Sequence, residues 1–154
     1  MKNLTLLFTL LTINLVIGQV QKQHVVEVPI EVSNAFEQAY PHKNVVWSSD
    51  FEGHNNQQLT YIAKFKVENR EVAVHYDQAG HFELIEEALS LSGLKAAITK
   101  YIAKNYGTFK STEAVKIIDS QNKTTYEVGI TDNTYFFDLQ FDDTGYFLQL
   151  IDKN

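Results

Sequence analysis

Two segments of the chain carry apolar residues at the three- and four-residue spacing of an amphipathic helix. The first covers residues 28–40; Pro29 lies in its first turn, where a proline costs no hydrogen bond, and Pro41 ends it. The second covers residues 94–106 and has Ser92 before it as its expected N-cap. We therefore expect two helices, one near the start of each half of the chain.

After each predicted helix come segments in which apolar and polar residues alternate, the pattern of half-buried β-strands. Polar pairs such as Glu68-Asn69 and Asp132-Asn133 separate some of them and indicate tight turns. The expected strands are 44–51, 59–67, 71–76 and 81–86 in the first half, and 110–118, 124–131, 134–141 and 146–151 in the second. The pattern predicts an α+β fold class: a tandem repeat of one helix plus a four-stranded antiparallel sheet.

The two halves also match residue by residue. The sharpest match joins residues 76–82 to residues 141–147, which share an Asp-x-x-Gly turn between aromatic residues at an offset of 65. The helices match at an offset of 66. Such a recurring offset indicates a duplication. We expect a first repeat at 19–88 and a second at 89–154, packed as one body because their junction is short and apolar.

The Asp-x-x-Gly turns set the expected faces of the sheet. Asp77 and Asp142 would accept hydrogen bonds from the turn backbone, and Gly80 and Gly145 would adopt positive φ. In the resulting register the helices would cover Val72, Val74, Tyr76, Phe82, Leu84, Phe137, Leu139, Phe141 and Phe147. The opposite, open face would carry Ala73, His75, Glu83, Ile85, Phe136, Asp138, Gln140, Leu148 and Leu150. Apolar residues on a face that no helix covers indicate a contact surface.

The composition excludes several functional classes. Among 154 residues, 13 Lys and Arg stand against 19 Asp and Glu, so the formal net charge of -6 argues against a nucleic-acid partner. The chain has no cysteine, which excludes disulfides, thiolate nucleophiles and Cys-ligated metals. His75 and His81 should point to opposite faces of one hairpin, and the other histidines are scattered. We therefore expect no metal site and no cofactor.

The first residues have the pattern of an export signal. Lys2 precedes a mostly apolar stretch at 4–17, and Gly18 offers a small residue at the cleavage point. This stretch is too short to span a bilayer. We expect a signal peptide at 1–18, cleavage between Gly18 and Gln19, no membrane span in the product, and a periplasmic or secreted location.

Catalytic motifs are absent from the sequence. It contains no Gly-x-Ser-x-Gly elbow, no phosphate-binding glycine loop and no dinucleotide fingerprint. A Ser-His-Asp site assembled only in three dimensions remains as an alternative, although nothing marks one of the five histidines as the base. We therefore expect that the protein is not an enzyme.

Five short motifs carry a resemblance to a known family. They are Val28-Pro29, the helix from Ala35-Phe36 to Tyr40-Pro41, Val45-x-Trp47, Tyr61-x-Ala63-x-Phe65 and Tyr76-Asp77-x-x-Gly80. In order and spacing they resemble the PepSY-like family of exported bacterial proteins, whose fold is related to that of the β-lactamase inhibitory protein. The second half departs from the pattern, since Lys95 and Glu113 stand where Pro29 and Trp47 do. The resemblance implies tandem helix-on-sheet repeats whose open sheet face serves as a binding surface.

The expected function is an exported non-enzymatic binding module that acts through this open face, with inhibition of a protein or peptidase as one form. Aromatic and apolar side chains on such a face suit a protein or peptide partner. The alternatives are a periplasmic small-molecule or metal-ion binding protein and, for the face itself, a solvated surface or burial against the other half. The candidate partner-binding residues are Ile62, Lys64, Lys66, His75, Glu83, Ile85, Phe136, Asp138, Leu148 and Leu150.

Overall fold

The computed structural model describes residues 26–52 and 58–153. The expected signal peptide and its cleavage point therefore lie outside the described residues. Each expected helix and strand lies within a few residues of an observed one. Along the chain the elements are α1 (Ile30–Ala39), β1 (Val46–Glu52), β2 (Gln58–Val67), β3 (Arg70–Tyr76), β4 (Phe82–Leu89), the 3₁₀ turn η1 (Leu91–Gly93), α2 (Ala96–Asn105), β5 (Lys110–Asp119), β6 (Thr124–Thr131), β7 (Phe136–Asp142) and β8 (Phe147–Asp152).

The eight strands form a single sheet in chain order, and every neighbouring pair is antiparallel. β4 continues to Leu89 and pairs with β5 from Leu84·Asp119 to Leu89·Ala114. The expected fold class, a tandem repeat of one helix plus a four-stranded sheet, is therefore wrong: the described residues form one eight-stranded antiparallel sheet with two helices. A separate four-stranded sheet would leave the outer N–H and C=O groups of β4 unpaired, whereas β5 satisfies them.

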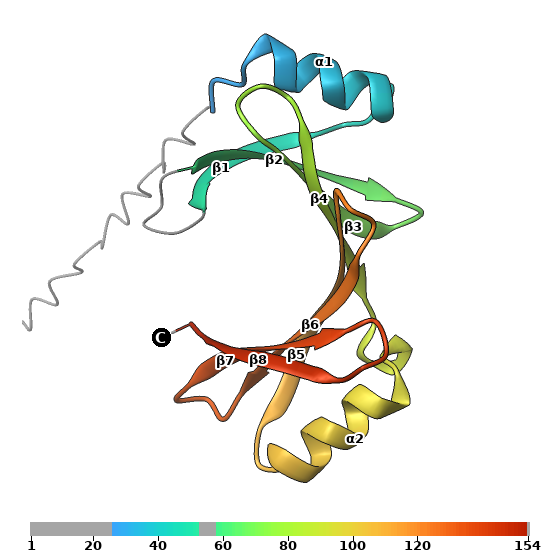
Figure 1. The fold of residues 1–154 in the computed structure, drawn as a ribbon, viewed down its shortest axis with the longest axis vertical. Coiled ribbons are helices and arrows are strands. Elements are labelled where there is room, and N and C mark those ends of the chain that lie inside the picture. Colours follow the sequence, from blue (N-terminus) through green and yellow to red (C-terminus); the bar gives the residue numbers. More distant parts are fainter. Residues whose placement is uncertain (1–25, 53–57, 154) are drawn as a thin grey trace, which may run out of the picture.

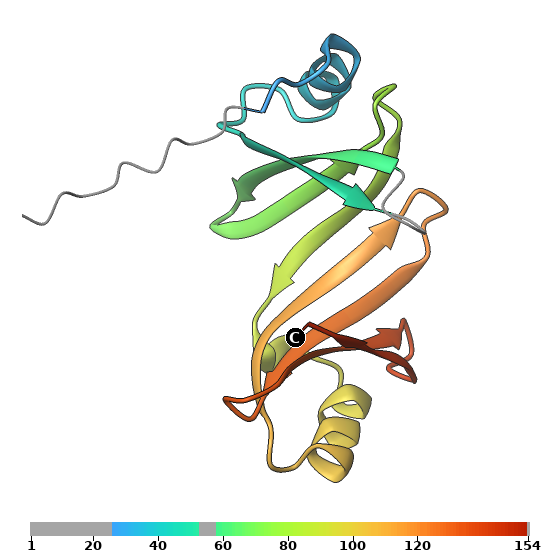
Figure 2. The same cartoon turned by 90° about the vertical axis from the view of Figure 1, so that its left-hand side faces the viewer.

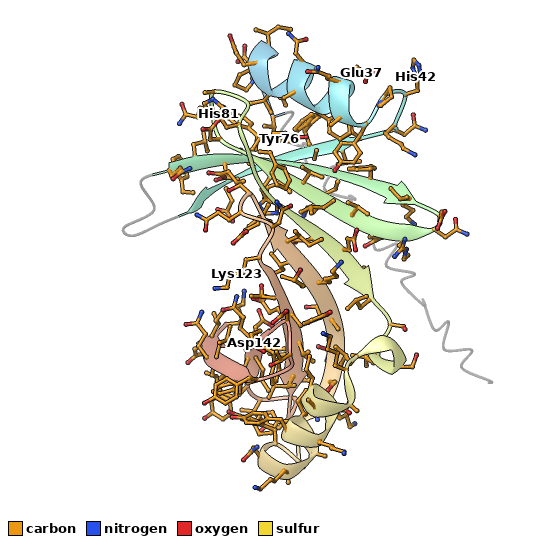
Figure 3. The ribbon with its side chains drawn as sticks, turned by 45° about the vertical axis from the view of Figure 1, so that its right-hand side comes forward. Glu37, His42, Tyr76, His81, Lys123 and Asp142 are labelled. Carbon is orange, nitrogen blue, oxygen red and sulfur yellow. The ribbon has the colours of Figure 1, made fainter. Side chains whose placement is uncertain are left out.

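Both helices pack on the same face of the sheet, one near each end (Figure 1). Ile85 packs against the α1 core and Leu89 against the α2 core, and residues four apart in a strand share a face. The α1 core holds Val32, Phe36, Tyr61, Ala63, Phe65, Val72, Val74 and Tyr76, and the α2 core holds Ile98, Ile102, Ala114, Val128, Ile130, Leu139 and Phe141. The expectation that Tyr76 and Phe141 face the helices is confirmed, and Figure 3 shows Tyr76 beneath α1.

The helix α2 begins later than expected. Lys95 occupies the N-cap position, and its carbonyl accepts the N–H of Thr99 at 3.2 Å. Ser92 lies in η1, which closes where the N–H of Gly93 bonds to the carbonyl of Ser90 at 2.8 Å. The expectation that Ser92 caps the helix is therefore wrong, because a separate turn takes up the residues before it.

The two Asp-x-x-Gly turns form as expected. Gly80 and Gly145 have φ angles of 81° and 90°, which favour glycine. Asp77 Oδ1 accepts two backbone N–H bonds of 2.8 Å within its turn, and Asp142 Oδ1 accepts two of 2.9 and 2.8 Å. Hydrogen bonds hold the pKa of Asp142 below its usual value, and the bond from the Thr144 hydroxyl has the largest effect. The sequence signal for these turns was therefore correct.

A β-bulge after the first turn changes the faces of β4. The register shifts between His75 and Tyr76, so that Val74 pairs with Ile85 rather than with Leu84. Ile85 accordingly packs into the α1 core, and Leu84 lies on the open face. The expected placements of Ile85 and Leu84 are both wrong, because one extra residue moves every later side chain of a strand to the other face.

The second hairpin contains the same bulge. The register shifts between Gln140 and Phe141, and Leu139 of the α2 core pairs with Leu150. Leu150 therefore lies on the helix side, and its expected placement on the open face is wrong for the same reason as that of Ile85. Leu148 is the extra residue of this bulge; it follows the helix-facing Phe147 and remains on the open face.

Each glycine turn also touches a helix. A Cβ on Gly80 would lie 2.6 Å from the backbone oxygen of Glu31 in α1, and one on Gly145 would lie 2.9 Å from the Cβ of Ala97 in α2. No L-amino-acid side chain fits at such distances without movement of the helix. The turns therefore fix how closely each helix approaches its hairpin.

We expect Gly80→Ala to lower the free energy of unfolding by about 2–3 kcal/mol, because it adds left-handed backbone strain to a clash with the α1 backbone. Gly93→Ala is the matched control: Gly93 is not a positive-φ residue, and its new Cβ would meet only the Ser90 hydroxyl, at 3.2 Å. Urea unfolding followed by Trp47 fluorescence measures both variants. Equal losses for the two would contradict the proposed packing of the turn on α1.

Candidate functional site

The face of the sheet opposite α1 and α2 is curved inward, and we call it the concave face. Figure 1 shows the sheet bent into a C with both helices outside the bend, and Figure 2 looks onto the inner side. No described helix covers this face. The concave face is therefore the surface on which the candidate partner-binding residues have to be placed.

A groove of about 1100 Å³ crosses the first five strands at one end of the concave face. Small residues form much of its floor, with Ala73 from β3, Ala88 from β4 and Val115 from β5. Lys64 and Lys66 of β2 bring positive charge to it, while β3, β4 and β5 contribute carboxylates from Glu71, Glu86 and Glu113. The groove thus has a basic side and an acidic side above an apolar floor.

The structure brings Lys64 and Lys66 into this groove as exposed side chains. Lys66 Nζ lies 3.9 Å from Glu71 Oε1, a distance at which two solvent-exposed charges attract only weakly. Ile62 is half-buried on the same face, in register with His75 of β3. These side chains therefore lie together on the concave face, as the sequence indicated.

His75 and Glu83 are also on the concave face, but both are engaged within the protein. His75 is only 6% exposed, and its Nε2 lies 3.6 Å from Glu86 Oε1. Glu83 accepts a hydrogen bond from the Thr60 hydroxyl at 3.1 Å and another from the Gln58 amide. Glu83 thus links β4 to the start of β2, so its carboxylate is already engaged in contacts within the sheet.

The second half of the concave face presents Phe136 and Leu148, which are 50% and 43% exposed. Asp138 lies between them in the chain, and Lys153 Nζ contacts its Oδ2 at 2.9 Å. Ile85 and Leu150 are not part of this surface, since both lie on the helix side. The candidate set is therefore reduced to eight residues on the concave face, spread over both halves.

A cluster of charged side chains that the sequence did not suggest lies near the middle of the concave face. Burial raises the pKa of Glu127 to about 7, and the neighbouring Asp138 adds to this through its charge and a hydrogen bond, while Lys153 acts in the opposite direction. Glu86 of β4 also faces Glu127. The alternation of residues in β6 could have placed Glu127 on this face. Its charged neighbours, however, come from β4, β7 and the C-terminal end, and only the register of the sheet shows that these segments lie close together.

The chemistry available on this face is that of ionic and apolar contact. Among residues 26–52 and 58–153, no three His, Cys, Asp or Glu side chains are grouped so that they could hold a metal ion. Over the same residues, no helix is long and apolar enough to cross a membrane. The concave face thus combines a groove at one end with a charged centre.

Comparison with known proteins gives the fold a context. No protein-family model matches the chain, and no curated protein sequence matches it. A solved structure described as a BLIP-like protein from Bacteroides fragilis superposes with a TM-score of 0.62 at 19% identity, covering 83% of this chain and 88% of that one. The chain has a BLIP-like fold.

Two further solved structures share this BLIP-like fold. A DUF2874 family protein from Bacteroides uniformis has a TM-score of 0.70 at 16% identity, with coverage of 82% of this chain and 90% of that one. A candidate periplasmic protein from Bacteroides eggerthii has a TM-score of 0.71 at 14% identity, with the same coverage. At such identities the likeness concerns the fold, and function has to be argued from the concave face itself.

We expect Glu127→Gln to stabilise the protein above pH 7 and to have little effect near pH 4. The raised pKa means that folded Glu127 keeps its proton between about pH 4.5 and 7 while the unfolded chain loses it, so wild-type stability falls as the pH rises through this window. Above pH 7 the variant should gain about 1–2 kcal/mol, a figure reduced for the partial exposure of the site.

Chemical denaturation at several pH values measures this difference. Glu113→Gln is the matched control, since Glu113 is an exposed carboxylate on the same face. A stability gain that does not depend on pH, or an equal gain in the control, would show that Glu127 is not held in a charged, partly buried cluster.

Proposed function

We propose that this protein is a non-enzymatic binding module that holds a partner protein on its concave face. The observation that carries the proposal is the groove of about 1100 Å³ on the face opposite both helices. The two helices account for the apolar cores on the other face, so the stability of the fold does not require the groove to be filled. A surface that is shaped and charged without serving the core is suited to recognition.

The composition of the groove supports a polypeptide partner. Its apolar floor of Ala73, Ala88 and Val115 admits a protruding backbone, and its lysines and carboxylates can meet charged side chains on either side. The exposed Phe136, at the other end of the face, extends the apolar contact area. A metal ion or a small molecule would instead need converging ligands, which the described residues do not group for a metal.

The proposal also includes export of the protein and its membership of the PepSY-like family. The signal pattern at 1–18 and the description of a BLIP-like-fold structure as a candidate periplasmic protein support a location in the periplasm or beyond. The order of the Val28-Pro29, Val45-x-Trp47 and Tyr76-Asp77-x-x-Gly80 motifs supports membership of the PepSY-like family. Inhibition of an exported enzyme is the form of binding that the neighbour described as BLIP-like favours.

The test is to fill the groove with a larger side chain or to reverse one of its charges, and then to measure the affinity for a partner. We expect Ala88→Arg and Lys64→Glu each to weaken binding at least tenfold, because one fills the floor and the other reverses a wall charge, a loss of about 1.4 kcal/mol or more. The immobilised mature chain would be used to isolate a partner from the cell envelope. Binding of the purified partner would then be titrated against each variant.

The matched controls lie on the helices. Ala39→Arg in α1 and Lys104→Glu in α2 make the same chemical changes at exposed positions away from the concave face. They should bind as tightly as the wild type. Equal affinity of all four variants, with circular dichroism showing that each is folded, would remove the groove as the binding site.

A further inference from the structure

The strand β8 is one of the two edges of the sheet and presents an apolar edge. Its sequence FLQLID contains no Lys, Arg or Pro, and Leu148 and Leu150 are 43% and 40% exposed. Charged residues and prolines are the usual means by which an edge strand avoids pairing with another chain. At the other edge, β1 (VWSSDFE) also lacks Lys, Arg and Pro and exposes Val46 and Phe51, but Asp50 accepts the N–H of Phe51 at 2.7 Å and so occupies one of its backbone donors. β8 is therefore the edge better suited to receive a further strand.

The register of β7 and β8 shows which backbone groups point away from the sheet. The N–H of Lys153 bonds to the carbonyl of Phe136 at 3.2 Å, so these residues form a hydrogen-bonded pair. Bonded and non-bonded pairs alternate along an antiparallel ladder. Leu139·Leu150 lies three positions further along and is therefore a non-bonded pair. The N–H and C=O of Leu150 accordingly point to the free side of β8.

We propose that β8 pairs with β8 of a second copy of this chain, antiparallel across a two-fold axis at Leu150. At such an axis a residue meets its own copy, and it can exchange both backbone hydrogen bonds only if its N–H and C=O point outward. Leu150 meets this condition. In the same register Gln149 of each copy lies opposite Ile151 of the other, so the regular ladder is centred on residues 149–151 and ends at the bulge that contains Leu148.

The side chains favour a second copy in this orientation. On the helix side the two Leu150 side chains meet, which removes from water an apolar group that the α2 core leaves 40% exposed. The charged residue of β8 is Asp152 at its C-terminal end. Antiparallel pairing places the two Asp152 carboxylates at opposite ends of the ladder, whereas parallel pairing would set them side by side at a cost in energy. The short ladder predicts a weak dimer that forms at high protein concentration.

This dimer leaves the groove between β1 and β5 uncovered, because β8 contributes no residue to it. The inference is therefore independent of the proposed function. A protein that dimerises at β8 would present two grooves, and each would still be tested by Ala88→Arg and Lys64→Glu. Failure of one proposal leaves the other unaffected.

Single cysteines give a direct test, since the chain contains none of its own. In Leu150→Cys the two Cα atoms would be about 5.5 Å apart, the spacing of a bonded antiparallel pair, which lies within the range that a disulfide spans. Leu148→Cys is the matched control on the same strand with nearly the same exposure. Its two cysteines would be roughly 14 Å apart, because Leu148 lies four residues from its own copy in this register.

The mature full-length variants would be oxidised mildly at concentrations from micromolar to millimolar and analysed on non-reducing gels. We expect at least tenfold more cross-linked dimer for Leu150→Cys than for Leu148→Cys. Sedimentation of the wild type over the same range should show a monomer–dimer equilibrium, which Leu150→Lys abolishes and Val46→Lys, on the other edge, leaves unchanged. Equal cross-linking of the two cysteine variants, no cross-linking of either, or a wild type that stays monomeric throughout would each overturn the proposal.

Discussion

The pairing of β4 with β5 is the interaction on which the rest of the structure depends. Six residue pairs, from Leu84·Asp119 to Leu89·Ala114, join strands from the two halves of the chain into one sheet. Glu87 and Lys116 reinforce this pairing on the helix side, where their charged groups lie 3.7 Å apart. Because the sheet is continuous, β4 holds both apolar cores on one face, with Ile85 in one and Leu89 in the other. The opposite face is thereby left for other contacts.

The helices and the glycine turns pack together on the outer side of that sheet. Each helix buries two residues, Val32 and Phe36 in α1 and Ile98 and Ile102 in α2, and each is met by a turn whose glycine permits close approach. The helices therefore lie outside the bend of the sheet at its two ends (Figure 1). The groove on the inner side is lined in part by the small side chains of Ala73 and Ala88.

The two ends of the sheet differ in what they offer to other molecules. The first five strands form a groove with lysines on one side and carboxylates on the other, whereas the last strand ends the sheet in an apolar edge. Between them lies the charged cluster around Glu127, whose pKa is raised because the ionised carboxylate is partly buried beside other acids. One fold thus carries the groove that we propose for recognition and, separately, the edge that we propose for self-association.

The sequence by itself determined the local elements. Helical periodicity located α1 and α2, alternation located the eight strands, and the Asp-x-x-Gly pattern fixed both turns, because each of these depends on residues close together in the chain. It also placed His75, Lys64 and Asp138 on the open face correctly, since alternation held up to the bulges. The tertiary structure alone decided that the strands form one sheet and that Ile85 and Leu150 turn to the helix side. A bulge adds one residue with no mark in the sequence, and the pairing of β4 with β5 depends on backbone groups that every residue carries.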